Sequence, residues 1–443
     1  MLLRFRVINH EALRDETELS LVRASLKTQT PPDGDWVGAT NRVAAVYGPN
    51  ASGKSTLLRA VSFLKQAVER PAAHGHSPGA AFPVQPYLLD AGSRSRPSLY
   101  EIDFVIDGVR HQYGFEVLLG RILEEYLYSY PSGKRRALFE RGEVLEETSF
   151  GRGLRGPNAG LLATASPSTL LLSCAPLVGH ADLLAIRDHL VEGLSLSEVA
   201  RTGRAEQLAW LRHALVDDEL RGRVEVLIRN ADLGITGISL QREELGPREV
   251  ERLVAAHERL ATGPDPVSLS ELLSDAEYTL QLQHASSDPR WPVSFPLSRE
   301  SDGTVAWLAV VVPALHAFAT GKTLLVDEVG ANLHPVLTRE LITIFKDPEL
   351  NRTGGQLVLT THDTALLGSL LGDALARDEV WFTEKQSDGA SVLYSLDEFE
   401  IRSEINVQER YLEGRFGAVP QVRNGQIRSA LFRSDGVGAD TPA

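Results

Sequence analysis

A glycine-rich segment between an apolar run and a stretch of helical spacing constrains the fold more than any other feature of this chain. It matches the pattern G-x-x-x-x-G-K-[ST] and reads Gly48-Pro49-Asn50-Ala51-Ser52-Gly53-Lys54-Ser55-Thr56. The apolar run 43–47 precedes it, and residues 57–64 follow with apolar side chains at helical spacing. A strand, such a loop and a helix in this order form a phosphate-binding loop. The sequence therefore predicts an α/β fold with a site for a nucleoside triphosphate.

The residue types in the loop predict how it holds its ligand. Backbone N–H groups at the glycines and at the helix start are expected to surround phosphate oxygens. Lys54 should reach the β- and γ-phosphates, and the Ser55 hydroxyl should bind Mg²⁺. The expected cofactor-binding residues of the loop are Gly48, Asn50, Ala51, Ser52, Gly53, Lys54, Ser55 and Thr56.

Two later apolar strands end in residues suited to the same chemistry. The run 323–326 is followed by Asp327 and Glu328. Adjacent carboxylates at a buried strand end are costly unless they face a cation or a polarised water, although a solvated strand end is the alternative. Asp327 is expected to hold Mg²⁺, and Glu328 to orient or deprotonate the attacking water. His362 follows the strand 356–361 and is expected to contact the γ-phosphate. The predicted catalytic residues are Lys54, Glu328 and His362.

Two further signals are weaker. Ser301 and Gly303 stand before an apolar helix at 305–319, where a hydroxyl and free N–H groups suit an anion. The same residues also form an ordinary helix N-cap. Gln85 lies in a loop-like region, 66–98, and is a candidate sensor of the γ-phosphate or of Mg²⁺; a surface amide is the alternative.

The pattern elsewhere indicates four parts. Alternating residues predict strands at 2–8, 17–23, 99–106, 112–118 and 122–129, with hairpin turns at Asp107-Gly108 and Leu119-Gly120. The region 150–167 is predicted to be a loop, and 168–290 to be mainly helical, with helices at 181–192, 205–231 and 248–261. Strands are expected at 279–283 and 293–297. The predicted division is a first half of the nucleotide-binding head at 1–150, a mainly helical inserted lobe at 151–280, a second half at 281–420 and a flexible tail at 421–443. No heptad pattern supports a long coiled-coil arm.

Composition limits the partners and the compartment. The chain has 443 residues, with 45 Lys and Arg against 59 Asp and Glu, so its formal net charge is −14. An acidic chain does not bind nucleic acid through overall charge, although a local arginine patch remains open. A single cysteine, Cys174, precludes an internal disulfide and fits a reducing compartment. No signal peptide is recognised, and the apolar stretch 305–319 is shorter than the roughly 20 residues that cross a bilayer. We expect a cytoplasmic protein with no membrane contact.

Together these motifs resemble, in their order, the ABC/SMC-type P-loop ATPase head that RecF and the ATPase half of OLD nucleases share. Short segments narrow the resemblance to the bacterial RloA/AbiLi-type family of stand-alone AAA/ABC-like ATPases of anti-phage defence systems. These segments are Glu300-Ser301-Asp302-Gly303-Thr304, Leu333-His334-Pro335, Thr361-His362-Asp363, Val380-Trp381-Phe382-Thr383-Glu384-Lys385 and Tyr411-Leu412-Glu413-Gly414-Arg415-Phe416-Gly417-Ala418-Val419-Pro420.

The resemblance implies an ATPase that uses ATP and Mg²⁺ and forms a head-to-tail homodimer or higher oligomer. Each ATP would lie between Lys54 of one subunit and Ser301 and Gly303 of the other. It also implies a separately encoded effector, such as a TOPRIM-like nuclease of the RloB kind, in anti-phage defence or abortive infection. One departure is Gly330, where the D-loop of such heads usually has an acid; it bears on the hydrolysis rate and on communication between paired sites.

The sequence reveals no nuclease site within the chain itself. Glu384 closes an apolar strand, but no Asp-x-Asp follows it, and a two-metal site needs more carboxylates. Two alternatives stay open. A RecF-like ATP-gated DNA clamp would show tight, salt-sensitive DNA binding. An ATP-bound oligomeric scaffold would show stable ATP-dependent assembly with little turnover.

Overall fold

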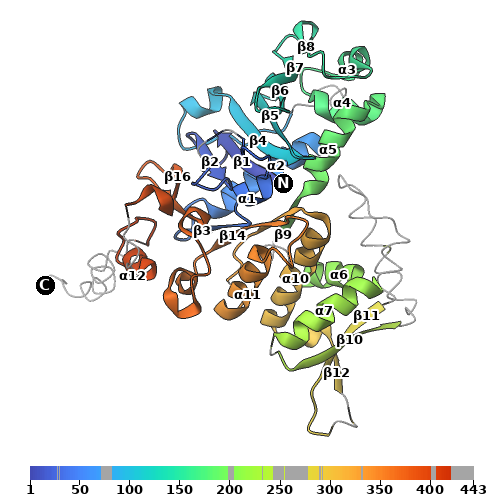
Figure 1. The fold of residues 1–443 in the computed structure, drawn as a ribbon, viewed down its shortest axis with the longest axis vertical. Helices are drawn as coiled ribbons and strands as arrows, with labels where there is room; N and C mark the ends of the chain where they lie inside the picture. The colour runs from blue at the N-terminus through green and yellow to red at the C-terminus, as the bar shows by residue number, and fades with distance from the viewer. Residues whose placement is uncertain are drawn as a thin grey trace, which may run out of the picture.

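The fold is described by a computed structural model that covers residues 1–26, 28, 30–70, 82–197, 204–231, 233–242, 254, 278–288, 291, 293–330, 333–400 and 406–420. A six-stranded sheet lies at its centre, in the order β16-β15-β3-β14-β13-β9 (Figure 1). Its strands are β3 (Val43–Tyr47), β9 (Leu194–Ser197), β13 (Thr323–Val326), β14 (Gln356–Thr361), β15 (Val380–Lys385) and β16 (Ser391–Ser395). All neighbouring pairs are parallel except β15 with β16.

The central strands form because their residues are apolar almost without a break. Every position of β3, β13 and β14 is buried, which is typical of parallel strands covered on both faces. Alternate residues of β3 pack on opposite faces, some with α2 (Lys54–Glu69) and the others with α10 (Asp302–Thr320) and α11 (Pro335–Lys346). The sheet thus separates α2 from α10.

A seven-stranded antiparallel sheet packs over α2, above the central sheet in Figure 1. Its order is β2-β1-β4-β5-β6-β7-β8. The strands are β1 (Leu2–Ile8), β2 (Thr17–Ser20), β4 (Ser98–Ile106), β5 (Val109–Leu118), β6 (Arg121–Tyr130), β7 (Arg136–Arg141) and β8 (Ser149–Phe150). Both predicted hairpin turns are confirmed, with left-handed φ at Asp107-Gly108 (48° and 76°) and at Leu119-Gly120 (50° and 80°).

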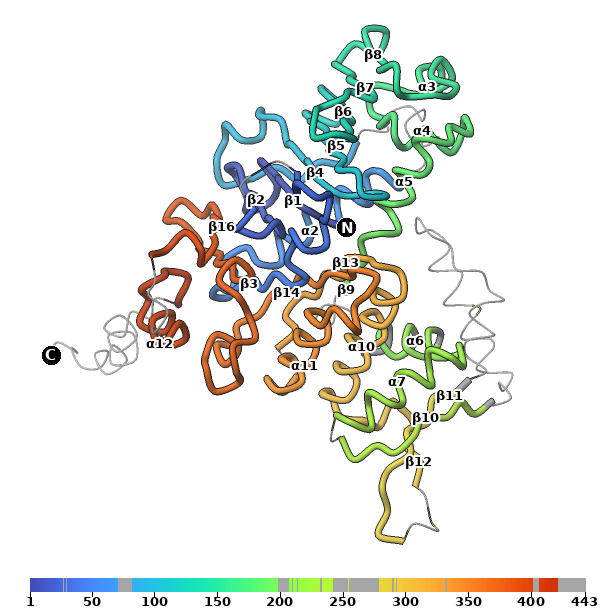
Figure 2. The backbone as a smooth tube through the Cα atoms, in the orientation of Figure 1, coloured from blue at the N-terminus to red at the C-terminus, as the bar shows by residue number. Residues whose placement is uncertain are grey.

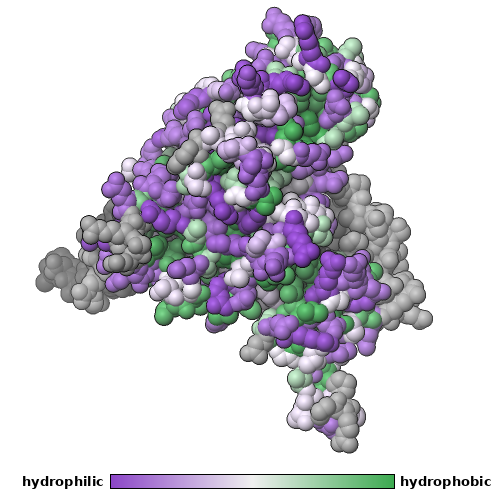
Figure 3. Space-filling view, viewed as in Figure 1, coloured by the Kyte–Doolittle hydropathy of each residue, from purple (hydrophilic) through white to green (hydrophobic). Residues whose placement is uncertain are grey.

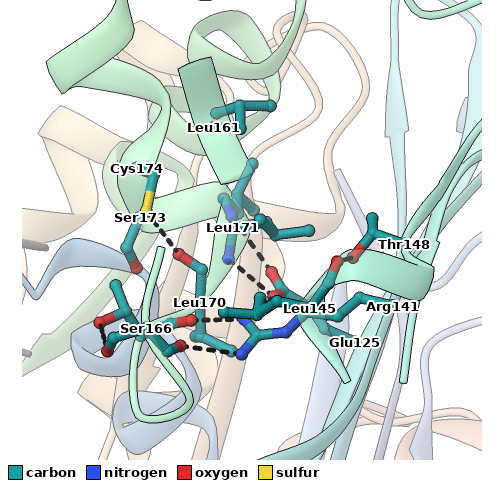
Figure 4. Close-up of polar contacts among 12 residues, drawn as sticks. Glu125, Arg141, Leu145, Thr148, Leu161, Ser166, Leu170, Leu171, Ser173 and Cys174 are labelled. Atoms are coloured by element: carbon teal, nitrogen blue, oxygen red, sulfur yellow. Dashed lines mark hydrogen bonds and ion pairs between the residues drawn. The ribbon is translucent and has the colours of Figure 1, made fainter. Parts of the chain in front are cut away.

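A buried ion pair ties this sheet to helix α4, the second helix after it in the chain (Figure 4). The side chains of Glu125 on β6 and Arg141 on β7 are 0% exposed. The Glu125 carboxylate accepts hydrogen bonds from the N–H groups of Leu171 (2.7 Å) and Leu172 (3.1 Å) and from the Tyr113 hydroxyl (3.0 Å). Leu171 and Leu172 open α4 (Leu171–Val178), so the carboxylate caps that helix. Arg141 donates to two backbone carbonyls just before α4.

A second group of elements packs beside α10, at the lower right of Figure 2. It consists of α6 (Arg204–Ala214), α7 (Asp218–Asn230) and the antiparallel strands β10 (Ile235–Arg242), β11 (Tyr278–His284) and β12 (Val293–Pro296). The remaining α-helices among the described residues are α1 (Trp36–Ala39), α3 (Asn158–Thr164), α5 (Ala181–Gly193) and α12 (Val407–Leu412). The face seen in Figure 3 is mainly hydrophilic, with hydrophobic side chains in separate patches.

Several predicted elements need correction. The region 150–167, expected to be a loop, contains α3, and 205–231 is two helices because Asp217 caps α7 through the Leu220 N–H at 2.7 Å. Strands β7, β8, β9, β10 and β16 were not predicted. β9 lies within the predicted lobe 151–280 yet pairs with β13 in the central sheet. The expected helix 248–261 and tail 421–443 lie outside the described residues, and the division of the chain into domains stays a prediction.

Helix α10 is the one helix among the described residues that is long and apolar enough to cross a membrane. Two thirds of its most apolar window is buried, and it packs against the central sheet and α7. The prediction of a buried core helix is confirmed.

Candidate nucleotide-binding site

The phosphate loop connects β3 to α2, and its two glycines are required by the hairpin formed by β15 and β16. A side chain at Gly48 (φ 155°) would place its Cβ 2.4 Å from the carbonyl oxygen of Thr383. A side chain at Gly53 (φ 111°) would place its Cβ 2.6 Å from the Ser391 Oγ. Ser52 adds a hydrogen bond to Thr383, with 2.6 Å between the two hydroxyl oxygens. The hairpin therefore fixes the shape of the loop.

Lys54 begins α2 and is buried, with 4% of its surface exposed. Its Nζ donates to the carbonyls of Gly48 (2.8 Å) and Pro49 (3.0 Å). Burial lowers the pKa of Lys54, and the nearby carboxylates of Glu328 and Asp327 oppose that shift. The ammonium is thus held by the loop carbonyls and is close enough to the acidic pair for their charges to affect it. In P-loop proteins the lysine of this motif contacts the β- and γ-phosphates.

Asp327 and Glu328 follow β13 and are joined by a hydroxyl from the neighbouring strand. The Thr360 Oγ1 on β14 donates to the Asp327 Oδ1 at 2.7 Å and accepts from the Glu328 N–H at 2.7 Å. Glu328 has a left-handed φ of 52°, an uncommon backbone conformation for a residue other than glycine, and such conformations cluster at functional sites. Sequence reasoning did not identify Thr360, because a threonine inside an apolar strand is ordinary.

The chemistry of the donors fits Mg²⁺. Asp327 is 4% exposed, and its Oδ2 accepts no hydrogen bond from the described residues. Ser55 is half-buried at the start of α2. The described part of the chain holds no group of three or more His, Cys, Asp or Glu that would form a cage of protein ligands. Mg²⁺ usually binds through one or two carboxylates and substrate phosphates, so a single aspartate and a hydroxyl suffice.

The end of β14 lies between the phosphate loop and the acidic pair, because β14 pairs with both β3 and β13. His362 follows this strand and is exposed. The next residue, Asp363, accepts from the Ala365 N–H at 3.0 Å and donates its own N–H to the Thr361 Oγ1 at 3.0 Å. The position of His362 at this edge of the sheet is the one expected for a residue that contacts the γ-phosphate. That role stays a prediction.

The departure at Gly330 has a local cause. A Cβ on Gly330 would lie 3.0 Å from the Thr361 Oγ1 and 3.3 Å from the Asp363 Cβ. An acidic side chain would crowd this hydroxyl and bring a second carboxylate to Asp363. Any side chain at position 330 therefore requires the Thr361 hydroxyl or the Asp363 side chain to shift by a few tenths of an ångström.

Ser301 and Gly303 are not brought to the phosphate loop within one chain. Ser301 caps α10, its Oγ accepting from the Thr304 N–H at 3.1 Å. In the described part of the chain no hydrogen bond or ion pair joins either residue to the loop. Helix α10 is about 28 Å long and β13 about 13 Å, from their rise per residue. Because a short turn at Gly321 reverses the chain between them, the N-terminus of α10 extends beyond the end of β13.

Gln85 is exposed and is linked to the site through its backbone. Its carbonyl accepts from the Glu11 N–H at 2.7 Å. The Glu11 carboxylate forms an ion pair with Arg59 of α2 and accepts from the Thr56 Oγ1 at 3.4 Å. Sequence reasoning missed Glu11, because no pattern marks the turn that follows β1. The sensor role of Gln85 stays a prediction.

Residues 43–175 and 181–368 match the family described as "AAA domain, putative AbiEii toxin, Type IV TA system". The chain belongs to this family. The matched segments include the phosphate loop, the acidic pair and His362. The predictions of an AAA-type domain and of an α/β fold, with the phosphate loop between a parallel strand and a helix, are thereby confirmed.

Solved structures also match. One is the SMC head domain from Thermotoga maritima, at 12% identity and a TM-score of 0.41, covering 90% of this chain and 99% of that one. Another is an ATP-binding cassette in a dimeric post-hydrolysis state bound to ADP and phosphate, at 12% identity and a TM-score of 0.29, covering 88% and 98%. No curated protein matches significantly.

Proposed function

We propose that this AAA-family protein binds ATP with Mg²⁺, hydrolyses it, and uses the cycle to control a separate effector. The observation that carries the proposal is the cluster of Lys54, Asp327, Glu328 and Thr360 at the end of adjacent parallel strands. Ligands of α/β proteins bind at the carboxyl ends of the strands.

In the proposed reaction, the loop N–H groups and Lys54 bind the phosphates. Ser55 and Asp327 would hold Mg²⁺, which would neutralise charge on the β- and γ-phosphates. Glu328 would accept a proton from the attacking water, and His362 would donate a hydrogen bond to the γ-phosphate. Thr360 positions both acids.

The site is completed, in this proposal, by a second copy of the chain. Ser301 and Gly303 stand at a helix N-terminus that suits an anion, and they lie apart from the loop of their own chain. A head-to-tail pair would bring this terminus to the γ-phosphate of the partner. ATP binding would then close the pair, and hydrolysis would open it.

The family description, which names a toxin of a TA system, supports an effector-linked role in phage defence or abortive infection. A TOPRIM-like nuclease is the proposed effector, and the cytoplasm the proposed location. Nucleic-acid binding by the chain is not part of the proposal, since its net charge is −14.

Light scattering and ATPase assays on wild type and Glu328→Gln test this function. We expect the variant to bind ATP, to lose hydrolysis, and to form a dimer or larger assembly only with ATP. Wild-type hydrolysis by the variant would remove Glu328 from catalysis. An assembly that is the same with and without ATP would favour a scaffold, and tight, salt-sensitive DNA binding would favour a clamp.

A further inference from the structure

An open groove of about 390 Å³ lies between the segment that contains Gln85 and the tip of the hairpin formed by β5 and β6. Its walls include Val84 and Leu88 on one side and Leu118 and Leu119 on the other. Leu88 is 60% exposed and Leu119 is 76% exposed. Scattered exposed leucines are common, but leucines gathered along a groove mark a contact surface.

Leu119 is exposed at an unfavourable backbone position. Its φ is 50°, in the left-handed region, where hairpin turns prefer Asn, Asp or Gly. The neighbouring hairpin of the same sheet has the preferred residue, Asp107, at the equivalent position with φ 48°. A leucine here is unfavourable for two reasons: a side chain with a Cβ disfavours the left-handed backbone conformation, and its apolar side chain is exposed to water. This combination is typical of residues kept for binding.

Two arginines border the apolar walls. Arg94 and Arg96 are exposed and line the groove, and their guanidinium groups form no ion pair or hydrogen bond with the described residues. The groove is therefore apolar inside and positively charged at its rim, although the whole chain is acidic.

The wall that carries these arginines is fastened to the nucleotide site. The Asn9 side chain donates to the carbonyls of Ser93 and Arg96, each at 2.9 Å, and accepts from the Tyr87 N–H at 3.0 Å. Two residues later, Glu11 binds Gln85 and the first turns of α2. Short contacts thus run from α2, which carries Ser55, to the groove, whose wall includes the 3-10 helix η2 (Gly92–Ser95).

We propose that this groove docks an acidic, amphipathic segment of a protein partner. Its aliphatic side chains would lie between Leu88 and Leu119, and its carboxylates would bind Arg94 and Arg96. Nucleic acid is the poorer ligand, because the described residues of the lining include no aromatic ring for base stacking and only two cations for phosphates. The inference rests on the proposed function for the existence of an effector, but not on ATP hydrolysis.

The test begins with a displayed library of random 16-residue peptides, selected on the full-length protein and counter-selected on Leu119→Glu. We expect enriched peptides with at least two Asp or Glu residues beside Leu, Ile or Phe. Their affinity, measured by fluorescence anisotropy on synthetic peptides, should fall at least tenfold in Leu119→Glu and in Arg94→Glu/Arg96→Glu. Leu350→Glu is the control, because Leu350 is 62% exposed and lies outside the groove.

Enriched peptides without acids, unchanged affinity in both groove variants, or no enrichment would overturn the proposal. Loss of binding to a labelled 20-nucleotide DNA in the groove variants would assign the surface to nucleic acid instead. Loss of a self-association measured by light scattering would assign it to a second copy. Peptide binding is measured in parallel on Glu328→Gln. The docking proposal is then tested independently of whether the protein hydrolyses ATP.

Discussion

At the scale of single residues, the hydroxyl of Thr360 links the acidic pair to the neighbouring strand of the central sheet. Thr360→Val removes the hydroxyl that contacts both Asp327 and the Glu328 N–H. Loss of a hydrogen-bond partner to metal-binding or catalytic groups typically costs 10–100-fold, so we expect kcat to fall by about that factor. Steady-state ATPase kinetics at several Mg²⁺ concentrations measure the loss. Thr360→Ser should keep most of the activity; equal loss in both variants would contradict the hydroxyl's role.

A second prediction at the residue scale concerns His10 and the dependence of the protein's stability on pH. It is fully buried against Tyr100, its Nδ1 lying 2.8 Å from the tyrosine hydroxyl, and burial lowers its pKa to about 4 from an ordinary value of 6.5. Between these values the unfolded chain binds more protons than the folded chain, so stability falls as the pH falls from 6.5 to 4. The loss from His10 alone should reach about 3 kcal/mol.

Urea unfolding of wild type and His10→Asn at pH 7 and pH 4.5 separates the contribution of His10 to the free energy of unfolding from the contributions of other titrating groups. The variant starts less stable, but its stability should change less between the two pH values. An unchanged pH dependence would show that His10 does not take up a proton on unfolding.

At the scale of elements, sequence patterns predicted the strands and turns that local chemistry decides. The apolar run of β14 and the Asp107-Gly108 turn were both predicted at their true positions. β9 could not be predicted, because four alternating residues become a strand only through pairing with β13. The phosphate loop and acidic pair were found from their motifs. Thr360 and Glu11 were not, because their roles arise from contacts between segments distant in sequence.

The prediction at the scale of elements concerns the ion pair of Glu125 and Arg141, which holds β6, β7 and α4 together. Breaking this pair should lower the stability of the protein. Arg141→Met leaves the Glu125 carboxylate buried without its cation and should destabilise the protein by about 3–5 kcal/mol. Arg121→Met is the control, because Arg121 and Glu143 are both 58% exposed at 3.7 Å. That surface pair should contribute less than about 1 kcal/mol. Equal midpoints in urea for the two variants would mean that the buried pair does not fasten α4.

At the scale of the whole molecule, the separation of Ser301 from the phosphate loop has a consequence for mixed assemblies. If each site combines Lys54 and Glu328 of one copy with Ser301 of the other, two inactive variants restore activity when mixed. In a pair of Lys54→Met with Ser301→Arg, one site has both defects and the other has none. Random mixing of equal amounts should then recover on the order of a quarter of wild-type hydrolysis, since a head-to-tail pair has two such sites.

A second mixture makes this result specific. Lys54→Met with Glu328→Gln should recover nothing, because both residues belong to the same half of each site and every site then keeps one defect. The two mixtures use the same parent variant, differ in one partner, and are compared by the rate of phosphate release. Recovery in both would mean that Lys54 and Glu328 act from different copies. Recovery in neither would place Ser301 outside the site, and the long N-terminal extension of α10 would then need another role.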